Sequence, residues 1–229
     1  IEKIMDNKKE IEVKNISKNF GKQKVLNGIN IVCNKGEITG IVGRNGSGKT
    51  VLLKCICDLM KVDEGEILIS GKNNVEYLGL KKGIGAVIEE PAFLGKYSGI
   101  ENLLFLYGIG HPFDKEKIIK AMIQVGLDPD LKKPVEKYSM GMKQKLGIAQ
   151  AIMENQKIII LDEPYNALDF QTNKEITSIL ENLKEQGKTI LLTSHQHEYL
   201  DKLCDRIFCI EDRKVVVFDE ELRRKYFEI

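Results

Sequence analysis

An eight-residue stretch rich in glycine has residue types and a spacing suited to holding phosphate groups. It consists of Gly43, Arg44, Asn45, Gly46, Ser47, Gly48, Lys49 and Thr50. In such a loop the glycines let backbone amides curl around phosphate oxygens, and the N-terminus of the following helix adds partial positive charge. The Lys49 ammonium would reach the terminal phosphates, and the Thr50 hydroxyl would ligate Mg²⁺. The stretch therefore predicts a phosphate-binding loop, against the alternative of an ordinary glycine turn.

Two adjacent carboxylates follow an apolar segment much farther along the chain. Residues 158–161 have the composition of a buried strand, and Asp162 and Glu163 come directly after it. Successive side chains on a strand point to opposite faces, so the two acids can have different roles. Asp162 suits the coordination shell of Mg²⁺, and Glu163 suits a general base that polarises the water attacking a γ-phosphate. An isolated acidic pair is usually a solvated turn, and the phosphate-binding loop is what favours the catalytic interpretation.

Both features need strands to position them. Residues 37–42 form an apolar segment that runs into the glycine-rich loop, and apolar residues recur at helical spacing over residues 49–60. Strand, loop and helix in this order form the arrangement that a phosphate site requires. Three further strand-like segments cover residues 157–161, 189–193 and 206–210, with helical connections between them. This alternation predicts an α/β fold around a mainly parallel sheet, the core of a P-loop NTPase.

The phosphate-binding residues are expected to end at Thr50. Position 51 is not a second threonine but Val51, and it is assigned no contact with the nucleotide. Val51 is instead the first residue of the apolar pattern that predicts the helix.

Two other regions differ in character. Short apolar alternations broken by glycine turns run over residues 11–42 and predict an antiparallel β subdomain. The region from Pro91 to Met153 contains three segments of helical periodicity, with Asp114 expected as a helix N-cap and Gly126 as a helix stop. We therefore expect a single domain over residues 1–229. Its predicted parts are a core with the β subdomain (11–90 and 154–219), an inserted helical subdomain (91–153) and a C-terminal tail (220–229).

Composition limits the remaining interpretations. The 229 residues are 42% hydrophobic, enough for a sizeable core, and 35 Lys and Arg nearly balance 34 Asp and Glu. That balance gives no overall basic field that would favour nucleic acid, and no apolar run reaches the roughly 18 residues that a membrane span needs. The first ten residues are too charged for a signal peptide, so a cytoplasmic protein is expected. Five cysteines without CxxC spacing predict buried free thiols rather than disulfides or a zinc site.

Residues 11–217 resemble the ABC ATPase family. Besides the phosphate-binding loop and the acidic pair, the segment Tyr138-Ser139-Met140-Gly141-Met142 is similar to the family signature, which generally reads Leu-Ser-Gly-Gly-Gln. The segment departs from that pattern at its first, third and fifth residues. The resemblance implies that Ser139, Gly141 and Met142 face the γ-phosphate of an ATP molecule held by a second copy of the chain. Ser139 is also a natural N-cap for the helix that follows.

The same resemblance assigns roles to three residues elsewhere in the chain. Asp169 would lie in a loop that crosses the dimer interface, and His195 would contact the γ-phosphate. Phe20 would stack on adenine, to which it offers area and a π-face. Taken alone, two of these residues have simpler interpretations. A lone histidine is more often a surface residue, and Phe20 could be a core aromatic at a strand end.

Position 89 is an informative departure from the family. The family usually has a glutamine there, which touches Mg²⁺ or the attacking water, whereas this chain has Glu89. Glu89 therefore joins Thr50 and Asp162 as a candidate metal ligand. A glutamate at this position, together with the altered signature, resembles the ATPases of bacitracin and lantibiotic-type exporters.

The resemblance implies an ATP-hydrolysing subunit that uses ATP and Mg²⁺ and dimerises with ATP bound. It would power a separate membrane permease at the inner face of the cell membrane, exporting a peptide antibiotic or a related amphiphile. One alternative is a soluble ABC protein of DNA repair or translation. Such proteins typically carry a long coiled coil or two cassettes in one chain, and neither is present here. A P-loop kinase is the third possibility, and it would leave the signature and His195 unexplained.

Overall fold

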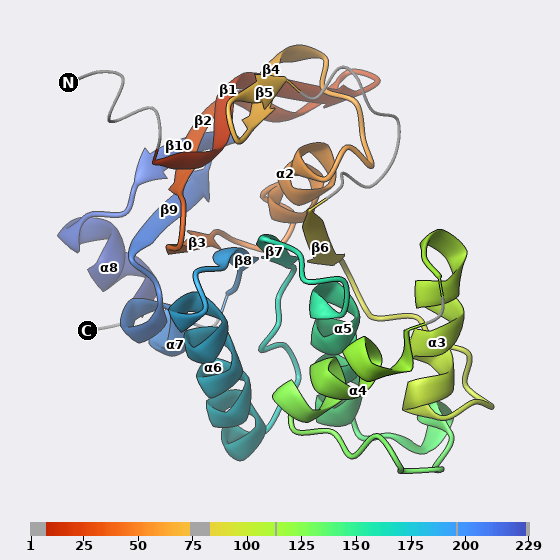
Figure 1. Cartoon of the computed structure of the whole chain (residues 1–229). Helices are drawn as coiled ribbons and strands as arrows, with labels where there is room; N and C mark the ends of the chain where they lie inside the picture. Colours follow the sequence, from red (N-terminus) through yellow and green to blue (C-terminus); the bar gives the residue numbers. More distant parts are fainter. Residues whose placement is uncertain (1–7, 74–82, 113, 196, 228–229) are drawn as a thin grey trace.

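Two β-sheets and the helices around them make up the part of the chain that the computed structural model describes (Figure 1). The described residues are 8–73, 83–112, 114–195 and 197–227. The smaller sheet is antiparallel, with the strand order β2-β1-β4-β5. Its strands are β1 (Lys9–Phe20), β2 (Gln23–Asn34), β4 (Glu64–Ile69) and β5 (Lys72–Asn73). The antiparallel β subdomain expected on the N-terminal side is thereby confirmed.

The larger sheet has six strands in the order β10-β9-β3-β8-β7-β6. The pairs joining β9, β3, β8, β7 and β6 are parallel, and only the pairing of β10 with β9 is antiparallel. This arrangement confirms the predicted parallel core. The strands are β3 (Ile38–Val42), β6 (Ile84–Val87), β7 (Ile158–Leu161), β8 (Thr189–Thr193), β9 (Arg206–Glu211) and β10 (Lys214–Val217).

The parallel sheet is buried on both faces, which explains why its central strands are continuous apolar runs. Ile41, Ile160 and Leu191 belong to a core shared with the antiparallel sheet and helix α2. The residue after each of them points the other way, into a second core shared with the remaining helices. The carboxyl ends of β3, β7 and β8 consequently lie side by side at one edge of the sheet.

Helix α2 (Lys49–Ile56) follows β3 and lies between the two sheets in Figure 1. It ends earlier than the predicted boundary at Met60. Asp58 takes a left-handed backbone conformation with φ 59°, and the amides of Leu59 and Met60 both turn back to the Lys54 carbonyl. That closing turn stops the helix although the apolar periodicity continues.

The inserted helical subdomain contains α3 (Gly99–Gly110), α4 (Lys115–Gln124) and α5 (Met140–Ile152). The predicted signals at its helix ends are confirmed, because Asp114 caps α4 and Gly126 takes φ 70° just after α4. Helix α3 begins at Gly99 because Ser98 and Glu101 form a capping box there. Helix α5 packs directly on β6: a Cβ added at Gly85 would lie 1.7 Å from the Ala151 carbonyl oxygen.

The other helices are α6 (Phe170–Glu185), α7 (His197–Leu203) and α8 (Glu220–Phe227). Helix α6 packs on β8, and α7 packs on β3 and α8. The segment expected to be a C-terminal tail therefore forms helix α8 over most of its length. Within the ranges that the structure describes, no helix is long and apolar enough to cross a membrane.

Candidate active site

The glycine-rich loop over residues 43–48 joins β3 to α2, as the sequence predicts. Gly48 has φ 101°, and a Cβ there would lie 2.9 Å from the Leu26 side chain and 3.2 Å from Val25. At Gly43, an added Cβ would lie 2.6 Å from Ser47 Oγ. Glycine is therefore required at both positions, by backbone conformation at Gly48 and by close approach at each.

The site ends at Thr50, and position 51 takes no part in it. The residue there is valine rather than threonine, so it has no hydroxyl to offer a phosphate or a metal ion. Val51 is half-buried in α2 and packs against the core that this helix shares with the antiparallel sheet. Val51 therefore has a packing role.

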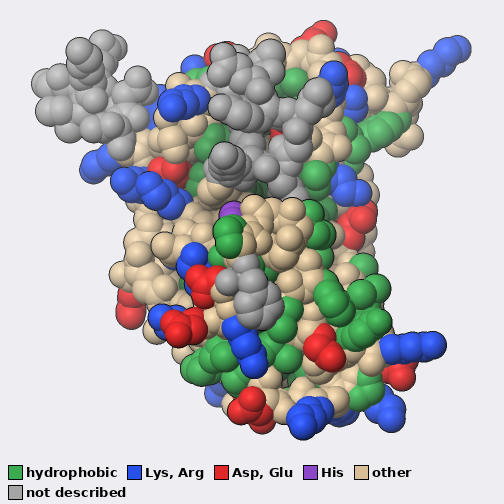
Figure 2. Space-filling view, turned by 45° about the vertical axis from the view of Figure 1, so that its right-hand side comes forward, with side chains coloured by type: hydrophobic (Ala, Val, Ile, Leu, Met, Phe, Trp, Pro, Cys, Tyr) green, Lys and Arg blue, Asp and Glu red, His purple; other side chains and the backbone are tan. Residues whose placement is uncertain are grey.

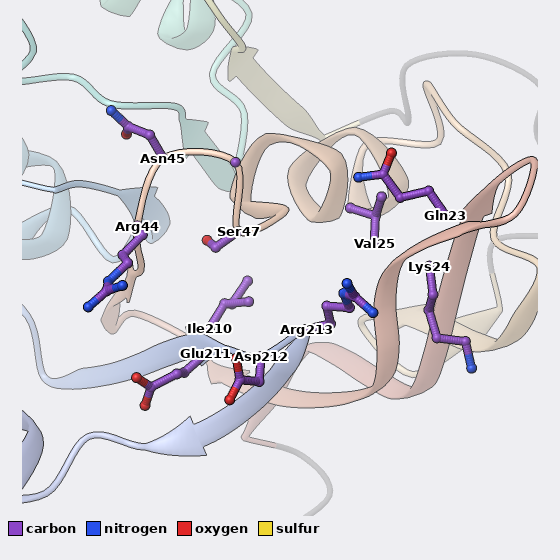
Figure 3. Close-up of a pocket in the computed structure, with 11 residues that line it drawn as sticks. Gln23, Lys24, Val25, Arg44, Asn45, Ser47, Ile210, Glu211, Asp212 and Arg213 are labelled. Atoms are coloured by element: carbon purple, nitrogen blue, oxygen red, sulfur yellow. The ribbon is translucent and has the colours of Figure 1, made fainter.

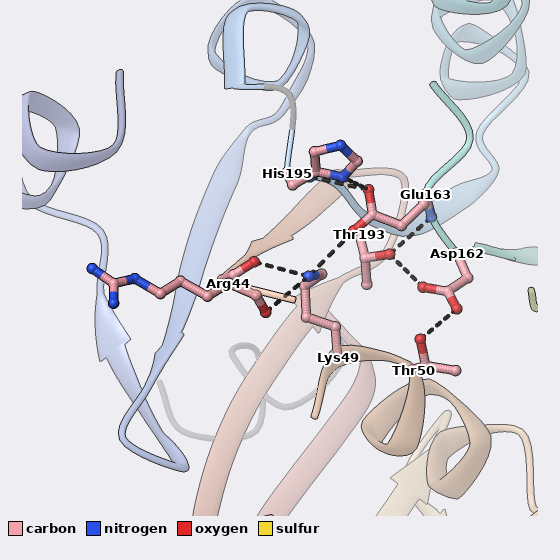
Figure 4. A network of polar contacts seen from close by, with 8 residues as sticks. Arg44, Lys49, Thr50, Asp162, Glu163, Thr193 and His195 are labelled. Carbon is pink, nitrogen blue, oxygen red and sulfur yellow. Dashed lines mark hydrogen bonds and ion pairs between the residues drawn. The ribbon is translucent and has the colours of Figure 1, made fainter. Parts of the chain in front are cut away.

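Lys49 is buried, with 6% of its surface exposed, and its ammonium turns back into the loop. The Nζ atom donates hydrogen bonds to the carbonyl oxygens of Gly43 at 2.8 Å and Arg44 at 3.4 Å (Figure 4). It also forms an ion pair with Glu163 Oε1 at 3.2 Å. The cation is thus held where the loop curls, with a carboxylate as its counter-ion.

Asp162 links the loop to the sheet through two hydroxyl groups. The Thr50 hydroxyl donates to Asp162 Oδ2 at 2.7 Å, and the Thr193 hydroxyl donates to Asp162 Oδ1 at 2.6 Å. The Thr193 oxygen in turn accepts a hydrogen bond from the Glu163 amide at 2.9 Å (Figure 4). Thr193 therefore holds both members of the acidic pair. This role of Thr193 was missed from the sequence alone, where the available signal was a polar residue at the end of the apolar strand β8.

Glu163 lies between Lys49 and His195. Its Oε2 accepts a hydrogen bond from the His195 amide at 3.0 Å and lies 2.7 Å from His195 Nδ1. The Glu163 backbone has φ 49°, a conformation that is uncommon for residues other than glycine and tends to occur at functional sites. Lys49 and His195 orient the Glu163 carboxylate, and the side chain is 20% exposed. The carboxylate can therefore reach an incoming water molecule.

The oxygen atoms around Thr50 suit Mg²⁺. This ion prefers oxygen ligands and is usually held by one or two carboxylates together with substrate phosphates. Thr50 supplies a hydroxyl and Asp162 a carboxylate, already in contact at 2.7 Å. Across the described residues there is no cluster of three or more His, Cys, Asp or Glu that could hold a metal by itself. The donor set therefore fits an ion that is completed by phosphate oxygens.

A cavity of about 280 Å³ opens beside the loop (Figure 3). Gln23 and Val25 approach it from β2, Ile210 from β9, and Arg213 from the turn between β9 and β10. The buried Ser47 Oγ also borders it, with no hydrogen-bond partner in the described part of the chain.

Phe20 lies next to a residue that lines this cavity. It is paired with Gln23 across the β1–β2 turn, and 47% of its surface is exposed. The Lys18 ammonium lies 5.8 Å from the ring centroid. An exposed aromatic face beside a cavity of this size can accept a planar ring. The simpler interpretation, a core aromatic, does not match this exposure.

The structure places the Glu89 carboxylate on Lys54, at 2.7 Å from its ammonium, rather than on Asp162. The Glu89 side chain is 64% exposed and its backbone has φ 62°. Its segment is nevertheless close to the acidic pair, because the Asp162 amide donates to the Val87 carbonyl at 2.8 Å. A metal-binding role for Glu89 stays a prediction, and it would require the carboxylate to leave Lys54.

The signature residues and Asp169 form a second group. Ser139 caps α5 by accepting from the Met142 amide, and Asp169 caps α6 by accepting from the Thr172 amide. A Cβ added at Gly141 would lie 2.6 Å from the Thr172 side chain, so the two helix starts touch. In the described part of the chain no hydrogen bond joins this group to Lys49 or Glu163.

Comparisons with known proteins agree with this geometry. The sequence pattern of the ABC transporter family matches residues 26–166. The bacitracin transport ATP-binding protein BcrA of Enterococcus faecalis is 38% identical over 90% of this chain and 68% of its own length. The lantibiotic transport ATP-binding protein SrtF of Streptococcus pyogenes is 33% identical over 92% of this chain and 90% of its own. The dimeric structure of a bacterial ABC transporter cassette superposes with a TM-score of 0.79 and 25% identity, covering 90% of this chain and 96% of that one.

Proposed function

This chain belongs to the ABC transporter family as an ATP-hydrolysing subunit, and from that premise we propose that Lys49, Asp162 and Glu163 form its catalytic centre. The observation that supports this assignment is the network of contacts in Figure 4, where the three side chains meet at the carboxyl ends of β3, β7 and β8. A site of this kind at a phosphate-binding loop supports phosphoryl transfer to water.

Each residue has a role that follows from its contacts. Lys49 would exchange its ion pair with Glu163 for the terminal phosphates of ATP, which are the stronger counter-charge. Glu163, still held by the His195 amide, would then orient and polarise the attacking water. Thr50 and Asp162 would hold Mg²⁺, which neutralises charge on the phosphate oxygens when bound. His195, which lies beside the same carboxylate, would contact the γ-phosphate.

The adenosine part of ATP would enter the cavity beside the loop. Phe20, which lies opposite the lining residue Gln23 and is exposed, would stack on the base. The loop residues Arg44, Asn45, Gly46, Ser47 and Gly48 would surround the phosphates through their backbone amides.

Two copies of the chain would complete each site. Ser139, Gly141 and Met142 lie in the group around the start of α5, away from the contacts of Lys49 within the same chain. A head-to-tail arrangement with two-fold symmetry would bring this segment of one copy to the ATP of the other, with Asp169 between them. The similarity to a dimeric cassette structure supports this proposal.

A membrane permease would be the partner, with the chain at the inner face of the cell membrane. Figure 2 shows hydrophobic side chains gathered among charged ones over the helical subdomain. Phe105 and Ile109 on α3 are 50% and 84% exposed, and the Phe105 ring packs edge-on against Tyr97. Such a patch is suited to protein contact. Similarity to transporters named for bacitracin and lantibiotics supports export of a peptide antibiotic or a related amphiphile.

Replacing Lys49 tests the assignment of the phosphate site. Lys49→Ala removes the only ammonium held in the loop within the described structure, so MgATP affinity should fall on the order of 10- to 100-fold and hydrolysis should stop. A fluorescent ATP analogue measures the affinity, and phosphate release measures the turnover. Lys120→Ala, at an exposed position on α4, is the matched control. Wild-type turnover by Lys49→Ala at saturating ATP would remove the proposed catalytic centre.

A further inference from the structure

A stacked pair of tyrosines joins the two segments that carry Glu163 and His195. The rings of Tyr165 and Tyr199 have centroids 5.0 Å apart and planes that differ by 18°. Tyr165 is fully buried, and Tyr199 is partly buried against the same core. Neither tyrosine is among the described residues that line the cavity beside the phosphate-binding loop. The two rings therefore meet inside the protein, and we call them the tyrosine stack.

Tyr165 is fixed relative to Glu163 by a tight turn. The Asn166 amide donates to the Glu163 carbonyl at 3.0 Å, which closes a turn with Pro164 at its second position. Proline favours that position because its φ is already near the value that the turn needs. The Tyr165 hydroxyl lies 3.2 Å from the Thr177 hydroxyl on α6, and burial raises the pKa of Tyr165, so the hydroxyl stays neutral. Glu163 and the Tyr165 ring should therefore move as one unit.

Tyr199 is fixed relative to His195 by the way the chain continues from β8. Ser194, the residue after β8, is fully buried, and its amide donates to the Ile41 carbonyl at 3.2 Å. His195 comes next, and Tyr199 lies in the first turn of α7. Helix α7 in turn packs on β3 and α6. The short stretch that carries His195 is therefore anchored by β8 on one side and by the tyrosine stack on the other.

The same two segments also meet at the proposed catalytic centre. The Glu163 carboxylate accepts from the His195 amide at 3.0 Å and lies 2.7 Å from His195 Nδ1 (Figure 4). The His195 side chain is 38% exposed, so packing around the imidazole alone does not fix its distance from the carboxylate. The tyrosine stack supplies a second contact between the segments, and this one lies in the core.

We propose that Tyr165 and Tyr199 are positioning residues, which keep His195 against the Glu163 carboxylate during hydrolysis. The proposal rests on the catalytic roles proposed above for Glu163 and His195. Stacked aromatic rings attract one another beyond the effect of the area they bury. A displacement of about 1 Å at a catalytic group can slow a reaction about 100-fold. The tyrosine stack would therefore support kcat without contacting the nucleotide.

Removing one ring of the stack should lower kcat and leave nucleotide binding unchanged. Tyr199→Leu keeps an apolar side chain and removes the ring that packs on Tyr165, so kcat should fall by about tenfold. KM for ATP should stay within about twofold of the wild-type value, because Lys49 keeps its place in the phosphate-binding loop. Tyr199→Phe keeps the stacked ring and should have the kcat of wild type.

The experiment measures phosphate release by the whole chain over a range of MgATP concentrations. The matched control for Tyr199→Leu is Tyr107→Leu in the helical subdomain. Tyr107 is 4% exposed, and its ring lies 4.9 Å from that of His111. Both substitutions remove a packed ring from the same core, so both should lower the thermal stability. At a temperature where circular dichroism shows every variant folded, only Tyr199→Leu should have a lower kcat. If Tyr199→Leu does not fold, Tyr199→Met takes its place with the same expectation.

His195→Ala distinguishes failure of this proposal from failure of the catalytic roles on which it rests. If His195→Ala slows hydrolysis while Tyr199→Leu has the kcat of wild type, the tyrosine stack does not position the pair, and the proposed catalytic centre stands. If Tyr199→Leu and Tyr107→Leu lose kcat equally, the tyrosine stack has only a general role in folding, and the proposal is wrong. If His195→Ala hydrolyses ATP at the wild-type rate, the role proposed for His195 fails and the positioning proposal fails with it.

Discussion

Thr193→Val tests how the acidic pair is held. The change replaces a hydroxyl by a methyl group of nearly the same shape, so it leaves no cavity in a residue that is fully buried. It removes two hydrogen bonds, the one donated to Asp162 Oδ1 at 2.6 Å and the one accepted from the Glu163 amide at 2.9 Å. A hydrogen bond to a charged group contributes about 1.5–3 kcal/mol and a neutral one about 1 kcal/mol. The free energy of unfolding should therefore fall by about 3 kcal/mol, equivalent to a Tm lower by roughly 8 °C for a chain of this size.

The same substitution should slow catalysis. Glu163 would lose the anchor on its backbone amide, and a small displacement of the general base lowers kcat on the order of tenfold or more. Urea denaturation and steady-state phosphate release measure the two effects. Thr193→Ser is the matched control, because it keeps the hydroxyl and loses only the methyl group. If Thr193→Val had a stability within about 0.5 kcal/mol of wild type and an unchanged kcat, Thr193 would not hold the acidic pair.

Two other predictions concern Glu89 and the cysteines. Glu89→Gln should keep ATP affinity and, because its ion pair with Lys54 is largely exposed, should change stability by less than about 1 kcal/mol. Hydrolysis by this variant should need a higher Mg²⁺ concentration, because an amide binds the ion less strongly than a carboxylate. If the Mg²⁺ dependence were unchanged, Glu89 would be an ordinary loop acid. Burial raises the pKa of the Cys33 and Cys57 thiols to about 12 and that of Cys55 to about 11. These thiols therefore stay protonated at pH 8, and a thiol reagent should modify them slowly in the native protein and rapidly after denaturation. Rapid modification of Cys33 in the native protein would contradict this burial.

The features that could be predicted from the sequence are those encoded by neighbouring residues. The loop over residues 43–48 lies between a strand and a helix, and the cap at Asp114 and the stop at Gly126 are where the local pattern places them. The parallel sheet followed from apolar segments separated by helical connections. In each case the sequence pattern that predicts the feature spans only a few residues, although the strand pairs of the sheet join distant segments.

The features that could not be predicted depend on contacts between distant segments. Thr193 gains its role only because β8 lies beside β7, which brings its hydroxyl to Asp162 across 31 positions of the chain. The ion pair between Lys54 and Glu89 joins α2 to the segment after β6 in the same way. A sequence pattern does not show which distant segments of the chain come into contact until the fold is known.

The central claim is that Glu163 activates the water that attacks ATP. The most direct measurement is a single-turnover assay with labelled ATP, in which wild type and Glu163→Gln are first saturated with nucleotide. A general base typically contributes about 10²–10⁴-fold in rate. The claim predicts that Glu163→Gln retains the ATP affinity of wild type and releases phosphate at least about 100-fold more slowly. Release of phosphate at the wild-type rate by a fully ATP-bound Glu163→Gln variant would contradict it.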